Sequence, residues 1–294
     1  MTRFFLAALA LSLIVFVYQY SAKNNLNGTN TYSFLVNNKQ DSNHLFLDSF
    51  EGNSRLVETG KPELSSSKKW WINSGAYLIF KNDIASTLQG KLPEDDTWRL
   101  LYKKNNSRDT DDGFYPQNIF RLVTQDNWRN FKQDTYFRIA KDNKSNSEYR
   151  NASNGVLHFN RYKDGDNLYY TGIRVDGYAV IKKKISGKYY TLAYNQIYPG
   201  KYDRENNPNL LPHGQWIGLR SEVMNNKTGS VDIKLYIDRG RNGNWELVAE
   251  ATDDGKKYGG SPFLEAGHAG IRTDFMDVEF DDYRIEEVVE STAQ

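Results

Sequence analysis

The chain has 294 residues, and its 38 lysine and arginine side chains nearly balance 37 aspartate and glutamate side chains. This balance gives no broad attraction for nucleic acid, so a nucleic-acid partner is not expected. Cysteine does not occur in the sequence, which excludes disulfide frameworks, thiolate catalysis and cysteine-based zinc sites.

The N-terminal residues predict export from the cytoplasm. Arg3 precedes an apolar run that carries no charge until Lys23, as in a secretion signal. Kept in place, the run is long enough to span a bilayer of about 30 Å, and bulky Tyr20 disfavours cleavage after Ala22. Residues 1–22 are therefore read as a signal peptide or a membrane anchor, with anchoring through residues 4–22. Either alternative predicts a protein that is secreted or held on the outer face of the cytoplasmic membrane.

The next stretch differs from everything that follows it. Residues 23–43 are rich in Asn, Ser and Thr and lack periodicity, which indicates a flexible tether. No second linker or internal repeat follows. Residues 44–290 are therefore predicted to form one domain.

Short strand-like runs dominate this domain. Tyr contributes 20 residues, and aromatic and β-branched side chains suit strands. The runs are separated by Gly, Asn and Asp clusters, and Asp176-Gly177 favours a tight hairpin turn. They lie at 76–81, 97–104, 118–124, 137–142, 155–162, 168–175, 178–185, 189–198, 215–223, 231–238 and 245–252. Even spacing of many short strands predicts an all-β antiparallel sandwich or jelly roll.

The acidic tail "GHAGIRTDFMDVEFDDYRIEE" (267–287) has two readings. A carboxylate pair could serve glycoside hydrolysis. However, Met276, Val278 and Phe280 alternate with acidic residues, as in a strand with one buried face. The phase slips at Asp281-Asp282, which predicts a β-bulge. A closing strand is the preferred interpretation.

This tail, together with "GQWIGLRSEVMNNKTGSVDIKLYIDRG" (214–240), resembles the last strands of concanavalin-A-like jelly rolls. That superfamily includes legume-type lectins, laminin-G-like modules, glucanases and β-sandwich polysaccharide lyases. The resemblance implies a fold, with glycans as the commonest ligands. It implies no specific activity, because the matching residues are structural.

The middle strands carry the residue types that glycan chemistry needs. Cleavage of an acidic polysaccharide by β-elimination requires a group that neutralises the uronate carboxylate and a His or Tyr that removes a proton. The candidate proton-transfer residues are His158, Tyr190 and Tyr194. The candidate substrate-binding residues are Asn160, Arg161, Arg174, Lys182, Lys184, Gln196, Tyr198 and Arg220.

The expected geometry follows from the period of a strand. Period two places His158, Asn160 and Tyr162 on one strand face, and Tyr190, Tyr194, Gln196 and Tyr198 on one face of another. If these strands are neighbours, His158, Arg174, Tyr194 and Gln196 line one groove. A solvated, tyrosine-rich sheet face is the alternative without chemistry.

Two acidic loops are candidate calcium sites, although no cofactor is required. They contain Asp109 and Asp111, and Asp164 and Asp166, whose carboxylates suit a hard cation. Turn-forming Asp and Gly residues explain both loops equally well without a metal.

The sequence therefore predicts an extracytoplasmic protein that binds a polysaccharide on a sheet face. Whether it is also an enzyme stays open. A polysaccharide lyase is the first enzymatic alternative and a glycoside hydrolase the second, and a laminin-G-like module that binds a protein partner is a third reading.

Overall fold

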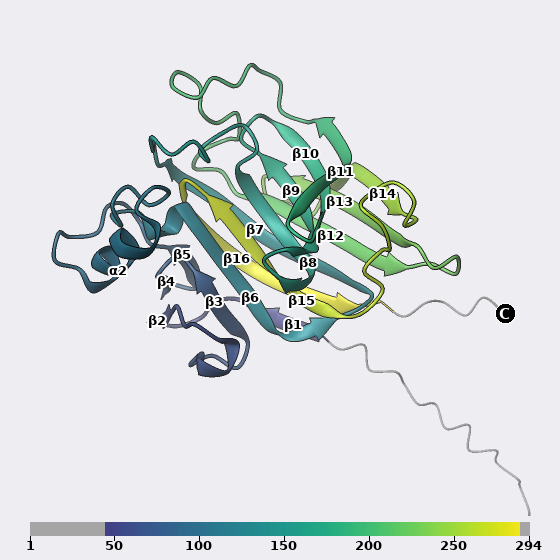
Figure 1. The fold of residues 1–294 in the computed structure, drawn as a ribbon, viewed down its shortest axis with the longest axis horizontal. Helices are drawn as coiled ribbons and strands as arrows, with labels where there is room; N and C mark the ends of the chain where they lie inside the picture. Colours follow the sequence, from purple (N-terminus) through teal and green to yellow (C-terminus); the bar gives the residue numbers. More distant parts are fainter. Residues whose placement is uncertain (1–44, 289–294) are drawn as a thin grey trace, which may run out of the picture. The chain divides into compact units, whose positions relative to one another are not determined.

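The computed structural model describes residues 45–288. The predicted signal or anchor (1–22) and tether (23–43) lie outside the described residues. In the described part, two antiparallel sheets form a sandwich (Figure 1).

One sheet has nine strands and contains both the first and the last strand of this part of the chain. In spatial order its strands are β14 (Trp245–Asp253), β13 (Val231–Arg239), β12 (Ile217–Asn225), β7 (Phe131–Asp142), β16 (Met276–Glu287), β5 (Ile84–Thr87), β4 (Tyr77–Lys81) and β2 (Ser54–Val57), and β1 (Leu45–Asp48) also pairs with β16.

The other sheet has seven strands, most of them from the middle of the chain. Their spatial order is β11 (Lys188–Gln196), β10 (Tyr178–Ile185), β9 (Asn167–Arg174), β8 (Gly155–Asp164), β15 (Gly267–Asp274), β6 (Ile119–Trp128) and β3 (Trp70–Ser74). The described helices are α2 (Thr97–Asn106) and the 3₁₀ turns η1 (Pro62–Leu64) and η2 (Pro116–Asn118). Figure 1 shows α2 beside β4 and β5, at the opposite end of the sandwich from β14.

The core lies between the two sheets. Phe280 of the nine-stranded sheet stacks on Phe120 of the seven-stranded sheet, with ring centroids 6.1 Å apart. Val278 and Ile271 are completely buried beside them. Burial of such side chains contributes roughly 1.5–3 kcal/mol each, so the closed sandwich supplies the main stabilisation of a chain that has no disulfides.

The predicted all-β antiparallel sandwich is confirmed, together with two of its local features. Asp176-Gly177 forms the β9–β10 turn, where Gly177 has φ +82°. The bulge at Asp281-Asp282 is confirmed by a register shift between β16 and β7 and by φ +48° at Asp282. The acidic tail thus forms the last two strands, β15 and β16, and its alternating part is the closing strand β16.

The strand predicted at 97–104 is wrong, because this segment forms α2. The Asp96 carboxylate accepts hydrogen bonds from the backbone N–H groups of Trp98 and Arg99, which caps the helix N-terminus. Tyr102 is buried on the inner side of the helix, and its hydroxyl donates to Glu58 at 2.5 Å. The N-cap and two buried helical positions, Arg99 and Tyr102, outweigh the alternation seen in the sequence.

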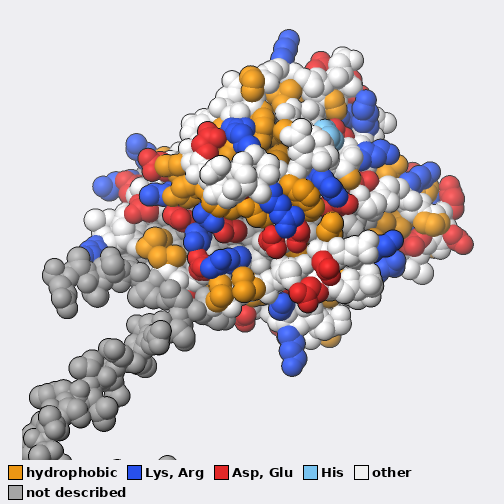
Figure 2. Space-filling model, turned by 180° about the vertical axis from the view of Figure 1, so that it is seen from behind, with side chains coloured by type: hydrophobic (Ala, Val, Ile, Leu, Met, Phe, Trp, Pro, Cys, Tyr) orange, Lys and Arg blue, Asp and Glu red, His pale blue; other side chains and the backbone are white. Residues whose placement is uncertain are grey.

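The surface carries charges of both signs. Figure 2 shows Lys and Arg side chains interspersed with Asp and Glu side chains, with hydrophobic side chains between them. In residues 45–288, no helix is long and apolar enough to cross a membrane.

Candidate functional site

The outer side of the seven-stranded sheet gathers basic and tyrosine side chains from several strands. Directly paired residues of antiparallel strands point to the same side of the sheet. Lys182 pairs with Tyr170 and Lys184 with Tyr189, whereas Ile181, the residue before Lys182, packs into the core. The same alternation places further residues outside. We call Arg174, Lys182, Lys184, Tyr189, Tyr194 and Arg272 the basic–tyrosine face.

Tyr194 is held rigidly on this face. Its ring stacks on Tyr178, with centroids 4.0 Å apart and planes inclined by 4°. Its hydroxyl donates to Asp176 Oδ2 at 2.7 Å, and the Arg174 guanidinium donates to the same oxygen at 2.6 Å. Burial and the hydrogen bond to Asp176 raise the pKa of Tyr194 to about 12. Tyr194 is therefore a protonated donor at neutral pH and is poorly suited to remove a proton.

Tyr189 differs from Tyr194 in its surroundings. Its ring is half exposed and stacks on Tyr170, whose hydroxyl accepts a hydrogen bond from Arg272 Nη1 at 3.3 Å. The Lys184 ammonium lies 5.0 Å from the ring centroid of Tyr189. Burial raises the pKa of Tyr189, but the charge and hydrogen bonding of Arg272 and the charge of Lys184 outweigh it, so this pKa is lowered. Tyr189 is thus the better base of the two tyrosines.

Lys182 is a cation without a salt-bridge partner among the described residues. Burial and the positive charges of Arg174 and Arg272 lower the pKa of Lys182 to about 8, although Asp176 and Asp274 act in the opposite direction. An anion placed here would relieve this repulsion.

Unused hydrogen-bond acceptors flank Lys182. Asp176 and Asp274 are both buried, and one carboxylate oxygen of each has no hydrogen-bond partner in the described part of the chain. Their other oxygens accept from Arg174 and Arg272, respectively. Because these two oxygens are enclosed within the protein, they add negative charge beside the Lys182 ammonium without being exposed to a ligand.

The structure does not bring His158 to this face. His158 and Asn160 are completely buried between the sheets, where His158 Nδ1 lies 3.1 Å from Ser221 Oγ and Asn160 accepts from Ser221. Burial lowers the pKa of His158 to about 3. The expected groove containing His158, Arg174, Tyr194 and Gln196 is therefore wrong, because β8 turns His158 toward the core.

Arg161 is also an interior residue rather than a ligand contact. With φ +50°, it interrupts the alternation of β8, so Tyr162 packs on the outer side with Phe159 rather than on the side of His158. Its guanidinium donates to the backbone oxygens of Arg129 and Phe263 and to Asn225 Oδ1. Burial lowers the pKa of Arg161 to about 10. Arg161 thus joins the β6–β7 turn, the end of β12 and the β14–β15 loop at one end of the sandwich.

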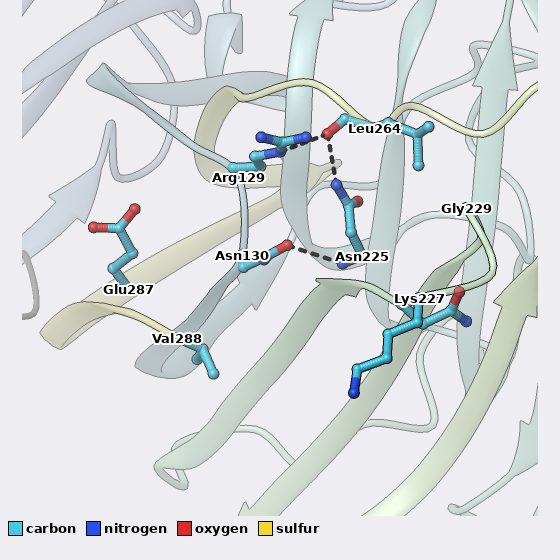
Figure 3. Close-up of a pocket in the computed structure, with 9 residues that line it drawn as sticks. Arg129, Asn130, Asn225, Lys227, Gly229, Leu264, Glu287 and Val288 are labelled. Atoms are coloured by element: carbon cyan, nitrogen blue, oxygen red, sulfur yellow. Dashed lines mark hydrogen bonds between the residues drawn. The ribbon is translucent and has the colours of Figure 1, made fainter. Parts of the chain in front are cut away.

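A pocket of about 630 Å³ lies over these loops (Figure 3). Arg129 and Asn225 both donate to the backbone oxygen of Leu264, at 3.2 and 3.0 Å. Lys227 and Glu287 contribute opposite charges to the lining. No residue that the sequence predicts as a site residue lines this pocket.

The remaining candidates are dispersed. Tyr190 points away from Tyr194, against Gly259, because an extra residue at Leu192 shifts the register of β11. Gln196 is exposed opposite Tyr178, at the edge of the basic–tyrosine face. Tyr198 lies beyond the end of β11, with the Arg239 guanidinium 4.7 Å from its ring centroid. Arg220 belongs to the nine-stranded sheet and cannot join the face.

The acidic loops do not converge on a metal. Asp109 and Asp111 accept hydrogen bonds from Ser147 and Ser145, and Asp164 accepts from the backbone of Asp166. Asp166 also forms an ion pair with Lys184 at 2.9 Å. Over residues 45–288, no three His, Asp or Glu side chains are placed to hold a metal ion. Calcium binding stays a prediction.

Sequence reasoning missed Tyr189 and Arg272. Regular alternation from Tyr194 favours Tyr190 over Tyr189, and the bulge at Leu192 has no clear sequence signal. Arg272 lies in the segment 267–287, whose pattern indicates only strands. Its position beside Tyr170 depends on β15 pairing with β8, which is distant in sequence.

Comparison with known proteins gives likenesses among solved structures. No protein-family model and no curated protein sequence matches the chain. A carbohydrate binding module, CBM66 from Bacillus subtilis, is 16% identical over 57% of this chain and 82% of its own, with a TM-score of 0.41. A Bacillus licheniformis beta-glucanase is 8% identical over 84% of this chain and 100% of its own, with a TM-score of 0.45. A Bacillus subtilis protein of unknown function with a galectin-like fold is 13% identical over 83% and 99%, with a TM-score of 0.41.

Proposed function

We propose that this protein binds an acidic polysaccharide on the basic–tyrosine face. One observation carries the proposal: the ammonium of Lys182 has no carboxylate partner in the described structure, although it lies among Arg174, Arg272 and exposed tyrosine rings. Placing two further cations beside an unpaired ammonium is electrostatically unfavourable, and solubility alone does not require it. A uronate carboxylate would supply the missing partner.

The other groups of the face suit the rest of a sugar chain. Exposed rings such as Tyr189 and Tyr194 can pack on pyranose faces while their hydroxyls stay hydrated. The Arg174 and Lys184 side chains can donate to further oxygens of the sugar chain, since guanidinium and ammonium groups carry several N–H donors. Charge therefore favours the acidic group, and the fixed ring of Tyr194 orients the sugar.

Affinity measurements with and without the central cation test this proposal. Retention on immobilised alginate, pectate and hyaluronan, with neutral glucan for comparison, would be measured for the native protein and for Lys182→Met. We expect binding to at least one acidic polymer and at least a tenfold weaker affinity for the variant, since a charge-assisted contact contributes about 1.5–3 kcal/mol. Lys234→Met, which removes an exposed lysine from the nine-stranded sheet, is the matched control.

Two results would refute the binding function. One is that the native protein is not retained on any acidic polymer, which would instead favour a protein partner. The other is that Lys182→Met binds as well as the native protein and the Lys234→Met control.

A polysaccharide lyase is the second candidate, favoured by the lowered pKa of Tyr189 beside Arg272. In such a reaction Tyr189 takes the C5 proton of a uronate whose carboxylate is neutralised by Lys182 or Arg272. The C5–H electron pair forms the C4=C5 double bond, the C4–O bond breaks, and the leaving oxygen takes up a proton. A lyase releases unsaturated, ultraviolet-absorbing chain ends. The lyase reading is supported if the native protein and Tyr190→Phe release them but Tyr189→Phe does not. If no acidic polymer yields such ends, only the binding function remains.

We also propose that the protein acts outside the cytoplasm, where such polymers occur. The support is the apolar run that follows Arg3. Fractionation of expressing cells, with the N-terminus of the mature chain determined, distinguishes a secreted product from an anchored one. Recovery of the full-length chain from the soluble cytoplasm would contradict both.

A further inference from the structure

A second pocket lies on the opposite sheet. It has a volume of about 310 Å³ and opens on the outer side of the nine-stranded sheet. This volume is at the lower end of the range for small-molecule sites. Its lining comes from five strands (β1, β7, β12, β14 and β16) and the segment after β1: Leu47, Asp48, Ser49, Asp134, Tyr136, Arg220, Trp245, Asp282, Tyr283 and Arg284.

Two aromatic rings in the pocket wall pack against Gly218, which has no side chain. A Cβ at Gly218 would lie 2.7 Å from the Trp245 ring and 2.9 Å from the Tyr136 ring. Both rings therefore lie directly on the backbone of β12, with their centroids 5.8 Å apart. Only glycine allows this close approach, which fixes Trp245 at the pocket edge.

An ion pair in the lining adds directed polar groups to this aromatic wall. Arg220 Nε and Nη2 donate to the two carboxylate oxygens of Asp134, each at 2.7 Å. The same guanidinium lies 3.9 Å from the ring centroid of Trp245. Stacking and bidentate pairing together hold Arg220 in one orientation, so donors and acceptors stand side by side at fixed positions.

The charges around the pocket are largely compensated. Asp282 pairs with Arg241 at 2.6 Å, and Asp48 lies 3.6 Å from the Lys69 ammonium. Arg284 pairs with Glu286. This differs from the basic–tyrosine face, where Lys182 has no such partner. A ligand of net charge would disturb these pairs, whereas a neutral ligand rich in hydroxyl groups would not.

We propose that this pocket binds the vicinal hydroxyl groups of a neutral sugar residue. One hydroxyl of a diol can accept from the Arg220 guanidinium while its neighbour donates to a carboxylate oxygen of Asp134, which matches the adjacent donor and acceptor. The Trp245 edge covers the apolar side of the ring. The site is independent of the basic–tyrosine face, so the protein has one sheet face for acidic sugars and another for neutral ones.

Saturation-transfer NMR with small neutral sugars tests the pocket directly. The probes are the methyl glycosides of glucose, galactose and mannose, and fructose, each paired with a deoxy analogue that lacks one hydroxyl of a diol. We expect at least one sugar to bind and its deoxy analogue to bind at least tenfold more weakly. Arg220→Lys should give a similar loss, because lysine keeps the charge but cannot pair bidentately with Asp134.

A second variant and a control keep the test sharp. Asp282→Asn changes an exposed rim carboxylate and is expected to weaken sugar binding several-fold without unfolding the sheet. Lys182→Met, on the other sheet, should leave neutral-sugar binding unchanged. The proposal is overturned if no sugar in the panel binds, if folded Arg220→Lys binds as well as the native protein, or if Lys182→Met removes the signal. None of these results depends on whether acidic polysaccharides bind.

Discussion

The two sides of the seven-stranded sheet use the same residue types for opposite purposes. On the inner side, Lys183 and Asp253 are both completely buried and form an ion pair at 2.8 Å. On the outer side, the neighbouring Lys182 has no salt-bridge partner among residues 45–288. Alternation along one strand thus separates a lysine that stabilises the fold from a lysine that is available to a ligand.

Histidine and tyrosine follow the same division. His158 is buried and its pKa is lowered to about 3, so it remains neutral in the interior. Tyr190 packs inward, whereas Tyr189 is half exposed on the outer side. The difference teaches that residue type alone does not identify the site. The side of the sheet, which bulges can reverse within a strand, decides it.

The strongest test of this comparison is removal of the interior lysine. Lys183→Met leaves the Asp253 carboxylate buried with only the Tyr169 hydroxyl as a side-chain donor. We expect the free energy of unfolding to fall by about 3–5 kcal/mol, the usual cost of an uncompensated buried charge. Urea denaturation followed by circular dichroism measures it.

The matched control is the next residue along the strand, Lys184. Lys184→Met removes an ion pair with the exposed Asp166 carboxylate and should cost less than about 1 kcal/mol. If Lys183→Met and Lys184→Met lowered the free energy of unfolding equally, the inner lysine would stabilise the fold no more than the outer lysine does.

A second test uses the pH dependence of stability. Because burial lowers the pKa of His158 to about 3, the unfolded chain binds a proton there at higher pH than the folded chain does. Stability should therefore decrease as pH falls below the ordinary value near 6.5, by about 2 kcal/mol between pH 6.5 and pH 5. Denaturation curves at several pH values should show this slope in the native protein and a shallower one in His158→Gln.

His213 provides a control of opposite sign. The hydrogen bond to Asp142 raises the pKa of His213, so its contribution to stability is present at low pH and is lost as pH rises through that raised pKa. His213→Gln should steepen the loss on acidification rather than reduce it. An unchanged slope in His158→Gln would mean that the interior histidine is protonated without cost.

The comparison also explains how much of the molecule could be predicted. Alternation in "FMDVEFDDY" and the turn at Asp176-Gly177 are local signals, and both led to correct features of the sandwich. Choosing between Tyr189 and Tyr190 required the bulge at Leu192, which arises only when β11 pairs with β10. Three residues selected from the sequence, Arg174, Lys182 and Tyr194, lie on the same side of the sheet, where the Arg174 guanidinium is 4.9 Å from the ring centroid of Tyr194. Their role in binding stays a prediction.

The long-range members of the site lay beyond such reasoning. Arg272 reaches Tyr170 because β15 inserts between β6 and β8, a pairing that joins residues more than a hundred positions apart. The second pocket similarly depends on Gly218, whose missing side chain matters only once Tyr136 and Trp245 lie on either side of it. A motif scan cannot detect a site that is created by strand order.

The smallest expected effect is the pH dependence of polysaccharide affinity, which depends on the outer residue Lys182. If a polysaccharide carboxylate pairs with the protonated form of Lys182, affinity should begin to fall near pH 8, the pKa that burial and the charges of Arg174 and Arg272 impose. Between pH 7 and pH 9 the protonated fraction decreases about tenfold, equivalent to ~1.4 kcal/mol of binding free energy. Lys182→Arg stays charged throughout this range, so its affinity should not change. An affinity of the native protein that held constant up to pH 10 would show that Lys182 is not the group that meets the anion, and would move the search along the same face to Arg272.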